Sequence, residues 1–314
     1  MRVASLLPSA TETLFALGVE PVGVSHSCDH PPAARERPTL TSTVVDHADR
    51  SAADIDEQMR EVDGAVYELD EERLAALEPD LLVTQATCDV CAVDASEVRA
   101  AAARLDPEPD VLACDPHSFA DALDDVVRIG EAVGEAAAAS ALRADCRERV
   151  DAVRERAERA VAAEGRPRTA VLDWTDPPIR AGHWVRDMVE LAGGDPSFQP
   201  EGPSEPVAWD DVRAADPEVL VVAPCGFDRE RARDAVADLA ARPGFDELRA
   251  VADDRAYAVD GNGLFNRPSH RLVDSLEALF ACLHPDRAAT PPAEHDRIAR
   301  ADRAATPSVR ADGG

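Results

Sequence analysis

The feature that most limits the fold of this chain is residues 135–163, which contain neither proline nor glycine. Apolar residues recur there three or four positions apart, at Leu142, Cys146, Val150, Val153, Ala157 and Val161. That spacing predicts one face of a single helix, which would span roughly 42 Å at a rise of 1.5 Å per residue. Such a helix is too long for one small α/β lobe, so we expect it to be a rigid connector between two lobes.

The sequence before this helix alternates short apolar runs with helical stretches. Strands are predicted at 3–7, 22–25, 80–85 and 110–114, and helices at 9–17, 71–77 and 95–105. The runs at 80–85 and 110–114 are continuously apolar, which is typical of parallel strands buried on both faces. In the first helix, Ser9 followed by Glu12 predicts a capping box, and Gly18 marks the end. These features indicate a doubly wound lobe.

The alternation resumes after Pro167. Strands are predicted at 169–174, 219–223 and 256–260, and helices at 183–191, 210–215, 229–241 and 269–282. The predicted fold class is α/β, with two doubly wound Rossmann-like lobes joined by one long backbone helix. The boundaries follow as an N-terminal lobe (1–134), a connecting helix (135–165), a C-terminal lobe (166–286) and a disordered tail (287–314), where periodicity is lost.

The charge composition excludes several classes of function. The chain has 33 arginines and no lysine against 62 acidic residues, a net charge of −29. No cationic stripe is available for nucleic acid or anionic lipid, and the absence of lysine excludes a P-loop and a Schiff base. A uniformly acidic coat suggests a halophilic protein from a high-salt cytoplasm, because high salt screens the repulsion. Compositional drift in a GC-rich genome is the alternative.

No run approaches the ~20 apolar residues of a membrane span, and residues 1–8 lack the features of a signal peptide. We therefore expect a cytoplasmic protein from the sequence as written, or an extracytoplasmic, membrane-associated one if an upstream start was missed. The odd count of 7 cysteines fits thiols or metal ligands better than a disulfide framework.

Ligands of open α/β sheets bind beyond the carboxyl ends of the strands. Four of the 7 cysteines directly follow predicted strands: Cys28, Cys88, Cys91 and Cys225. The Cys88/Cys91 pair has the spacing for two thiolates on one metal, and Cys28 with Cys225 would complete a site for zinc or an iron–sulfur cluster. A redox disulfide and buried structural thiols are the alternatives. We assign Cys114, Cys146 and Cys282 to the core.

Other candidate ligand-binding residues follow strands or begin helices in the C-terminal lobe. Trp174 and Trp184 would suit flat contact with a large ring system. His183 could ligate a metal or bind the ligand, and its alternative is a helix-start residue with Trp184 packed beneath it. Arg267 and Arg271, beside Pro268, could receive an anionic or amide-rich ligand edge or form surface ion pairs. No nucleophile elbow, H-E-x-x-H, G-x-G-x-x-G or Walker motif is found, so we expect no catalytic residues and no enzyme.

Several motifs together resemble the substrate-binding proteins of ABC importers for cobalamin and siderophores, the class III periplasmic binding proteins with a helical backbone. They are Ser-Leu-Leu-Pro-Ser-Ala-Thr-Glu (5–12), Cys-Asp-His-Pro (28–31), Cys-Asp-Val-Cys-Ala-Val (88–93), Gly-His-Trp (182–184), Pro-Cys-Gly-Phe (224–227) and the run from Asp-Gly-Asn to Asn-Arg-Pro (260–268). The resemblance covers roughly residues 2–285 and is closest to a cobalamin-binding branch.

The resemblance implies a ligand held between two lobes that move little, and one docking carboxylate on each lobe for arginines of an ABC permease. These fall on Glu72 and on Asp210, where the family usually has Glu. We therefore expect a monomeric binding protein for cobalamin or a related corrinoid, acting with an ABC importer or in cytosolic delivery. The alternative is a cytosolic metal- or iron–sulfur-binding protein, possibly an enzyme, that uses Cys28, Cys88, Cys91 and Cys225 on the same scaffold.

Overall fold

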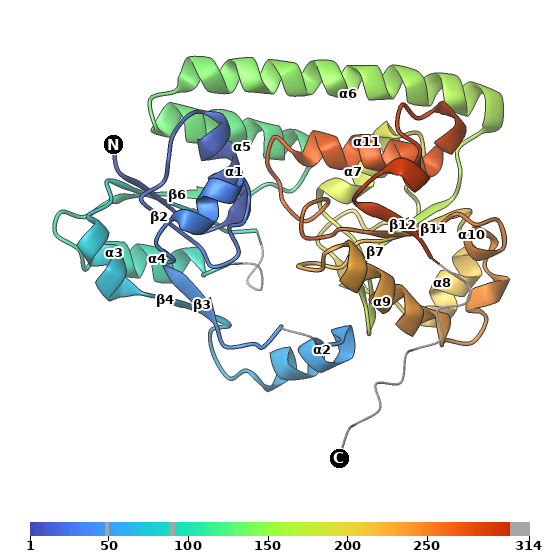
Figure 1. The fold of residues 1–314 in the computed structure, drawn as a ribbon, viewed down its shortest axis with the longest axis horizontal. Coiled ribbons are helices and arrows are strands. Elements are labelled where there is room, and N and C mark those ends of the chain that lie inside the picture. The colour runs from blue at the N-terminus through green and yellow to red at the C-terminus, as the bar shows by residue number, and fades with distance from the viewer. Residues whose placement is uncertain (48–49, 88–91, 302–314) are drawn as a thin grey trace. The chain divides into compact units, whose positions relative to one another are not determined.

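The computed structural model describes residues 1–47, 50–87 and 92–301, and its chain forms two compact units (Figure 1). The first unit comprises Met1–Arg50, Asp54–Glu148 and Arg267–Arg271, and the second comprises Ser51–Ala53, Arg149–Asn266 and Leu272–Gly314. The predicted boundaries differ in two ways. The division falls within the long helix, and Arg267–Arg271 joins the first unit because its side chains bind residues there.

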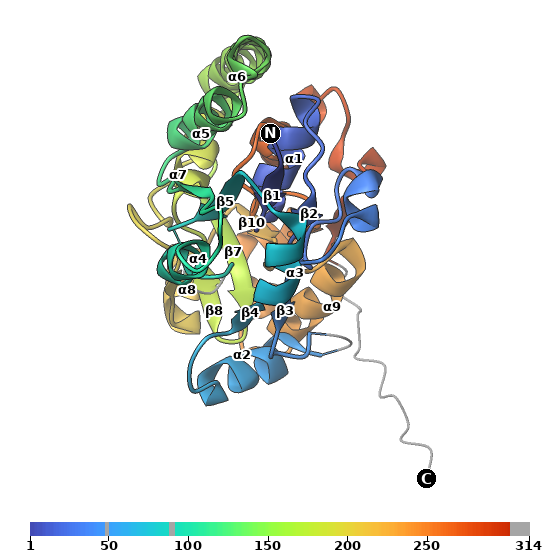
Figure 2. The same cartoon turned by 90° about the vertical axis from the view of Figure 1, so that its left-hand side faces the viewer.

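The first unit is built on a four-stranded parallel sheet in the order β2-β1-β5-β6. Neighbouring residues of one strand pack on opposite faces, since side chains alternate along a strand. Val3 and Val83 join Leu14 and Ile129 in one core cluster. Ala4 and Leu82 join Leu74 and Val98 in another. The sheet is therefore covered on both faces, as a doubly wound lobe requires, and Figure 2 shows this unit facing the viewer.

The elements of the first unit match most of the expected segments. The strands are β1 (Val3–Ser5), β2 (Gly23–Val24), β5 (Leu81–Gln85) and β6 (Asp110–Cys114), and the helices are α1 (Pro8–Ala16), α3 (Glu71–Leu77), α4 (Ala95–Ala102) and α5 (Phe119–Ala132). The sequence analysis did not place α5, the antiparallel pair β3 (Thr41–Thr43) and β4 (Tyr67–Leu69), η1 (Pro32–Glu36) or α2 (Ala52–Glu61). Strands of three residues are too short to show a periodicity.

The start of α1 corrects the predicted capping box. The helix begins at Pro8, and its N-cap is Leu7, which provides no side-chain hydrogen bond. Proline is well suited to the first helical position because it needs no N–H partner there and its φ is already helical. Ser9 therefore lies inside the helix, and the carboxylate of Glu12 binds other partners.

The second unit has a six-stranded mixed sheet in the order β12-β11-β10-β7-β8-β9, in which β7, β10 and β11 run parallel. On one face, Leu172, Leu220 and Val222 pack against Val236 and Leu239. The strands are β7 (Thr169–Thr175), β8 (Pro178–Arg180), β9 (Glu205–Pro206), β10 (Val219–Val222), β11 (Ala256–Val259) and β12 (Ile298–Arg300). The helices are α7 (Trp184–Leu191), α8 (Trp209–Ala215), α9 (Arg229–Ala240), α10 (Arg249–Ala252) and α11 (Leu272–Leu283), with short turns η2 (Phe245–Glu247), η3 (Pro285–Arg287) and η4 (Pro292–Glu294).

The strand β12 corrects the prediction of a disordered tail from residue 287 onward. It pairs antiparallel with β11, and Ile298 lies opposite Val259 with its side chain buried. A three-residue strand gains its stability from this edge pairing and from one buried aliphatic side chain, neither of which the sequence pattern reveals. Residues 302–314 lie outside the described part of the chain.

The long helix α6 (Ala136–Glu164) covers the segment for which one helix was predicted. Cys146, Val153 and Ala157 of the predicted apolar face are buried. In the second unit, the guanidinium of Arg149 binds Asp274 at 2.7 Å and Glu277 at 2.8 Å, which ties α6 to α11. No helix in the described residues has both the length and the apolar character needed to span a bilayer.

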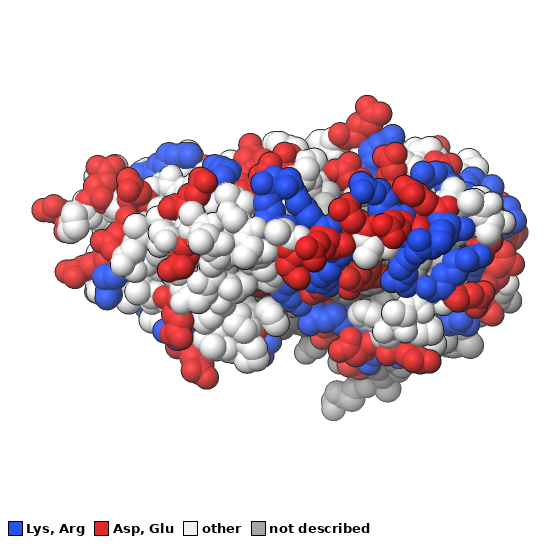
Figure 3. All heavy atoms as spheres, turned by 90° about the horizontal axis from the view of Figure 1, so that it is seen from above, with Lys and Arg blue, Asp and Glu red and all other residues white. Residues whose placement is uncertain are grey.

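Acidic and basic side chains alternate over the face shown in Figure 3. Many acidic and basic residues form exposed ion pairs, such as Arg104 with Glu71 and Arg154 with Asp151. Each exposed pair contributes at most about 1 kcal/mol. The stability of both units therefore depends mainly on their aliphatic cores.

Candidate functional site

The carboxyl ends of β7, β10 and β11 lie at one edge of the second unit's sheet, because these strands are parallel. Trp174 is the penultimate residue of β7 and is partly exposed, and Cys225 follows β10 and is exposed. The indole N–H of Trp174 donates to the carbonyl of Asp176 at 3.2 Å. Its ring meets the buried Phe227 edge-on, with the centroids 5.3 Å apart. An aromatic surface is thus held in a fixed orientation at the edge where α/β sheets bind ligands.

A β-bulge places a carboxylate beside Trp174. The register between β7 and β8 shifts between Leu172 and Trp174, so Asp173 is the extra residue of β7. Its Oδ2 accepts a hydrogen bond of 2.5 Å from the Ser204 hydroxyl, which in turn accepts one of 2.9 Å from the Gly182 amide. Burial raises the pKa of Asp173 to about 6, against the hydrogen bond from Ser204, which lowers it.

The raised pKa of Asp173 leads to a prediction about stability. The pKa of Asp173 is higher in the folded state than in the unfolded state, so its ionisation lowers the free energy of unfolding. This loss builds up as the pH rises from about 4 to about 6 and is complete above that window. The side-chain amide in the variant Asp173→Asn would still accept the bond from Ser204 but carries no charge. We expect the variant to melt above the wild type at pH 7.5 and level with it at pH 4, as measured by differential scanning fluorimetry. A difference that is the same at both pH values would contradict this assignment.

His183 occupies a strained position in front of α7. Its φ of 52° lies in the left-handed region, which is costly for a residue with a Cβ. Its amide donates to the carbonyl of Gly202 at 2.7 Å. A Cβ on the preceding Gly182 would lie 2.3 Å from the backbone of Pro203, so only glycine permits this approach. The loop that contains Gly202 and Ser204 therefore fixes the backbone of His183, and it also supplies the hydroxyl that binds Asp173.

Trp184 lies behind His183 in the core. Its side chain is buried, and its indole N–H donates to the carbonyl of Phe265 at 2.6 Å. The imidazole of His183 stacks on it at a centroid distance of 5.4 Å. The arrangement matches the alternative in which Trp184 supports His183, and His183 itself remains partly exposed.

The run 260–268 packs on the loop after β10. The side-chain amide of Asn266 donates to the carbonyls of Ala223 at 3.0 Å and Gly261 at 2.9 Å. A Cβ on Gly261 would lie 2.2 Å from the carbonyl oxygen of Pro224, which only glycine avoids. The turn thus supports the loop that presents Cys225.

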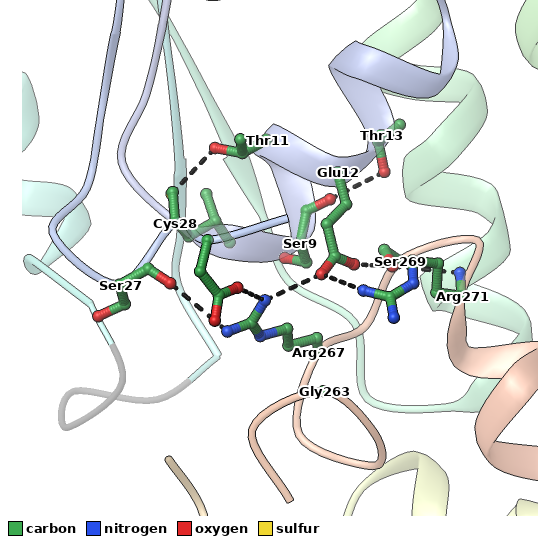
Figure 4. A network of polar contacts seen from close by, with 12 residues as sticks. Ser9, Thr11, Glu12, Thr13, Ser27, Cys28, Gly263, Arg267, Ser269 and Arg271 are labelled. Atoms are coloured by element: carbon green, nitrogen blue, oxygen red, sulfur yellow. Dashed lines mark hydrogen bonds and ion pairs between the residues drawn. The ribbon is translucent and has the colours of Figure 1, made fainter. Parts of the chain in front are cut away.

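Arg267 and Arg271 lie in the first unit, in a buried ion cluster centred on Glu12 (Figure 4). The side chain of Glu12 is 0% exposed, and its Oε1 accepts bonds of 3.0 Å from Arg267 and 2.8 Å from Arg271. The Ser269 hydroxyl donates to Oε2 at 2.7 Å. Arg267 also binds Asp29 at 2.6 Å. We call these five residues the Glu12 cluster; it binds Arg267–Arg271 to the first unit.

Cys28 is buried beside this cluster, with its Sγ 3.0 Å from the Thr11 hydroxyl. Burial raises the pKa of the Cys28 thiol to about 11, so the sulfur is protonated at neutral pH. Cys88 and Cys91 lie outside the described residues. Among the residues that are described, no group of three His, Cys, Asp or Glu side chains is arranged to hold a metal ion. The four-cysteine site therefore stays a prediction.

The two predicted docking carboxylates occupy the same position in corresponding helices. Glu72 is the second residue of α3, Asp210 is the second residue of α8, and both helices have seven residues. Each helix ends in a left-handed residue with φ 41°, followed by proline, an acidic residue and a buried strand. Both carboxylates are exposed.

One arginine in each unit holds the end of the helix that carries the predicted docking carboxylate. The amide of Arg2 donates to Asp80 at 2.6 Å, and its Nε donates to the carbonyl of Leu77 at 2.9 Å. In the second unit, the amide of Arg168 donates to Glu218 at 3.0 Å, and its side chain donates to the carbonyl of Asp216 at 2.7 Å. The two units therefore share a repeated element that fixes an exposed acidic helix start against the sheet.

A pocket of about 400 Å³ in the second unit lies near the start of β7, away from the carboxyl edge. Its arginines, Arg168 and Arg180, are already bonded to Asp216 and Glu205. The pocket thus offers no unpaired cation, and we do not assign the ligand to it.

Comparisons with known proteins agree with this architecture. Residues 3–262 match the family described as periplasmic binding protein. A periplasmic heme-binding protein from Pseudomonas aeruginosa is 20% identical with a TM-score of 0.73, covering 95% of this chain and 97% of that one. The heme-binding protein RhuT from Roseiflexus is 23% identical with a TM-score of 0.68, covering 92% and 99%. The vitamin B12 binding protein BtuF of Vibrio cholerae is 21% identical with a TM-score of 0.64, covering 90% and 96%.

No curated protein matches the sequence significantly. The similarity to the solved structures, at these identities, shows the fold alone. The match over residues 3–262 covers most of the chain and both α/β units, and the family consists of solute-binding proteins that work with ABC permeases. The chain therefore belongs to the periplasmic binding protein family.

Proposed function

We propose that this protein is the substrate-binding protein of an ABC importer for cobalamin or a related corrinoid, acting outside the cytoplasmic membrane without catalysing a reaction. The observation that carries the proposal is the partly exposed indole of Trp174, fixed at the carboxyl edge of the second unit's sheet. A flat aromatic surface suits a large macrocycle. A corrinoid also brings its own cobalt and axial ligands, so the protein need supply only ring contacts and hydrogen-bond partners.

Within this proposal, Trp174 contacts the ring, and His183 and Cys225 contact the ring edge. Trp184 supports His183 from the core. Cys28 and Arg267 are both buried and already bonded within the first unit, so we assign them a structural role in that unit.

The test is isothermal titration calorimetry of the purified protein with cyanocobalamin, dicyanocobinamide and hemin. The proposal predicts saturable 1:1 binding of at least one corrinoid, more tightly than hemin. Binding of hemin with no corrinoid binding would overturn it.

Heme transport is the second candidate, and His183 favours it. A partly exposed imidazole at the sheet edge is a potential axial ligand for iron, and two of the similar folds are named as heme-binding proteins. In that case hemin would give a Soret shift that His183→Ala abolishes.

The repeated docking helices give a prediction about transport. Replacing Glu72 and Asp210 together by alanine should leave corrinoid affinity within about 2-fold, because both carboxylates are exposed at helix starts. We expect uptake through the cognate permease to fall at least 10-fold, since two charge pairs would be lost at about 1 kcal/mol or more each. The measurement is uptake of radiolabelled cobalamin into permease-containing proteoliposomes.

The matched control replaces Glu97 in α4 and Asp246 in η2, which are also acidic residues in first turns. This pair should leave uptake unchanged. Equal losses in both double variants would show that general charge, rather than docking at these two helices, determines transport.

A further inference from the structure

The position of Asp173 suggests a role beyond the structure of β7. A β-bulge turns a side chain away from the direction that regular pairing would give it, and bulges are common beside binding sites. Asp173 is the extra residue of the bulge, directly before Trp174. Its own carbonyl accepts a bond of 3.1 Å from the amide of Cys225. The backbone of Asp173 is thus held next to Trp174 and Cys225, two residues that we propose to contact the ligand.

The bonding of this carboxyl group is asymmetric. Oδ2 accepts from Ser204, which is itself held by Gly182 and its neighbours. In the described part of the chain no arginine or histidine forms an ion pair with Asp173, and the residue as a whole keeps some exposed surface although its carboxyl group is largely desolvated. An ionised carboxylate can only accept hydrogen bonds. The edge beside Trp174 therefore favours a ligand group that donates and disfavours one that carries negative charge.

This distinction separates two classes of macrocycle. The side chains of a complete corrinoid are neutral primary amides, whose N–H groups donate. Heme and corrin precursors with free side-chain acids present carboxylates, which would face Asp173 with like charge. Specificity of this kind depends on repulsion of the wrong ligand as well as attraction of the right one.

We propose that Asp173 is a specificity-determining residue that selects macrocycles with amide-bearing edges over macrocycles with carboxylate-bearing edges. The inference rests on the proposed function, because it assumes that the ligand lies against Trp174. Ser204 is its positioning residue, since its hydroxyl holds the carboxylate in place.

The experiment compares two ligands that share one corrin ring: dicyanocobinamide, which carries amides, and dicyanocobyrinic acid, which carries the corresponding acids. Dissociation constants are measured at pH 7.5 in 0.15 M salt by quenching of tryptophan fluorescence. We expect the wild type to prefer cobinamide at least 10-fold, and Asp173→Asn to reduce that preference at least 5-fold. The ratio of the two constants is the readout, because a merely structural loosening would weaken both ligands alike.

Asp253→Asn is the matched control, since it makes the same charge change in an exposed residue before β11, at the amino end of the same sheet. It should leave the preference unchanged. An unchanged ratio in Asp173→Asn, or an equal change in Asp253→Asn, would overturn the role of Asp173 while corrinoid binding stands. Failure of the wild type to bind any corrinoid would overturn the proposed function and this inference with it.

Discussion

Replacing Glu12 by glutamine is expected to destabilise the first unit by about 3 kcal/mol, because it removes the buried carboxylate charge that both Arg267 and Arg271 bind. The carboxylate has no exposed surface and accepts bonds from Arg267, Ser269 and Arg271. Arg267 keeps its ion pair with Asp29, whereas the ion pair between Arg271 and Glu12 is lost. The measurement is urea unfolding followed by far-UV circular dichroism.

Fluorescence provides a second signal in the same experiment. All three tryptophans, Trp174, Trp184 and Trp209, lie in the second unit, so their emission reports that unit. In Glu12→Gln we expect the circular dichroism transition to move to a lower urea concentration than in the wild type. The midpoint of the fluorescence transition should move less. The control Glu97→Gln, in the exposed first turn of α4, should cost less than about 0.5 kcal/mol. A loss below about 1 kcal/mol for Glu12→Gln would contradict the role given to the Glu12 cluster.

Replacing Trp174 by alanine is expected to weaken corrinoid binding by about 10- to 100-fold. Aromatic residues that anchor a ligand commonly account for about 1.4–2.7 kcal/mol of the binding free energy. The indole is oriented before the ligand arrives, through its bond to Asp176 and its contact with Phe227, so little ordering is needed on binding. The dissociation constant is measured by the shift of the corrin absorption bands.

The matched control is Trp209→Phe in α8. Trp209 also has a phenylalanine partner, Phe245, on which its ring stacks, and its N–H donates to the carbonyl of Pro243 at 2.8 Å. Trp209 lies in the helix before β10, whereas Cys225 follows β10, so the two residues are at opposite ends of that strand. Its replacement should change the affinity less than 2-fold. If both variants lost affinity equally, the loss would come from damage to the second unit and not from a missing ring contact.

The fold could be predicted because its signals are local and strong. The strand β10 is four consecutive buried aliphatic residues, and α6 is 29 residues long with a regular apolar face. The strands that the sequence did not indicate, β3, β4, β8, β9 and β12, have only two or three residues each. Their positions depend on the partner strand, so no pattern within them marks their place.

The sequence indicated only some residues of the candidate site, for a similar reason. The sequence drew attention to Trp174, His183 and Cys225 because each follows a strand or begins a helix. It did not indicate Asp173, whose position depends on a bulge against β8 and on the Ser204 hydroxyl 31 residues away. The Glu12 cluster was missed because the spacing of Ser9 and Glu12 fits a helix cap. The partners of Glu12 lie 255 or more residues further along the chain.

The most direct test of the central claim is an absorption spectrum with metal analysis on protein purified without oxygen, before and after addition of cyanocobalamin. We expect the purified protein to carry no stoichiometric metal, and we expect the corrin bands of the added cyanocobalamin to shift, with the shift saturating at one equivalent. Stoichiometric zinc or iron in the purified protein, lost in Cys88→Ser and accompanied by unchanged corrin bands, would contradict it. That result would make the predicted site of Cys28, Cys88, Cys91 and Cys225 the functional centre.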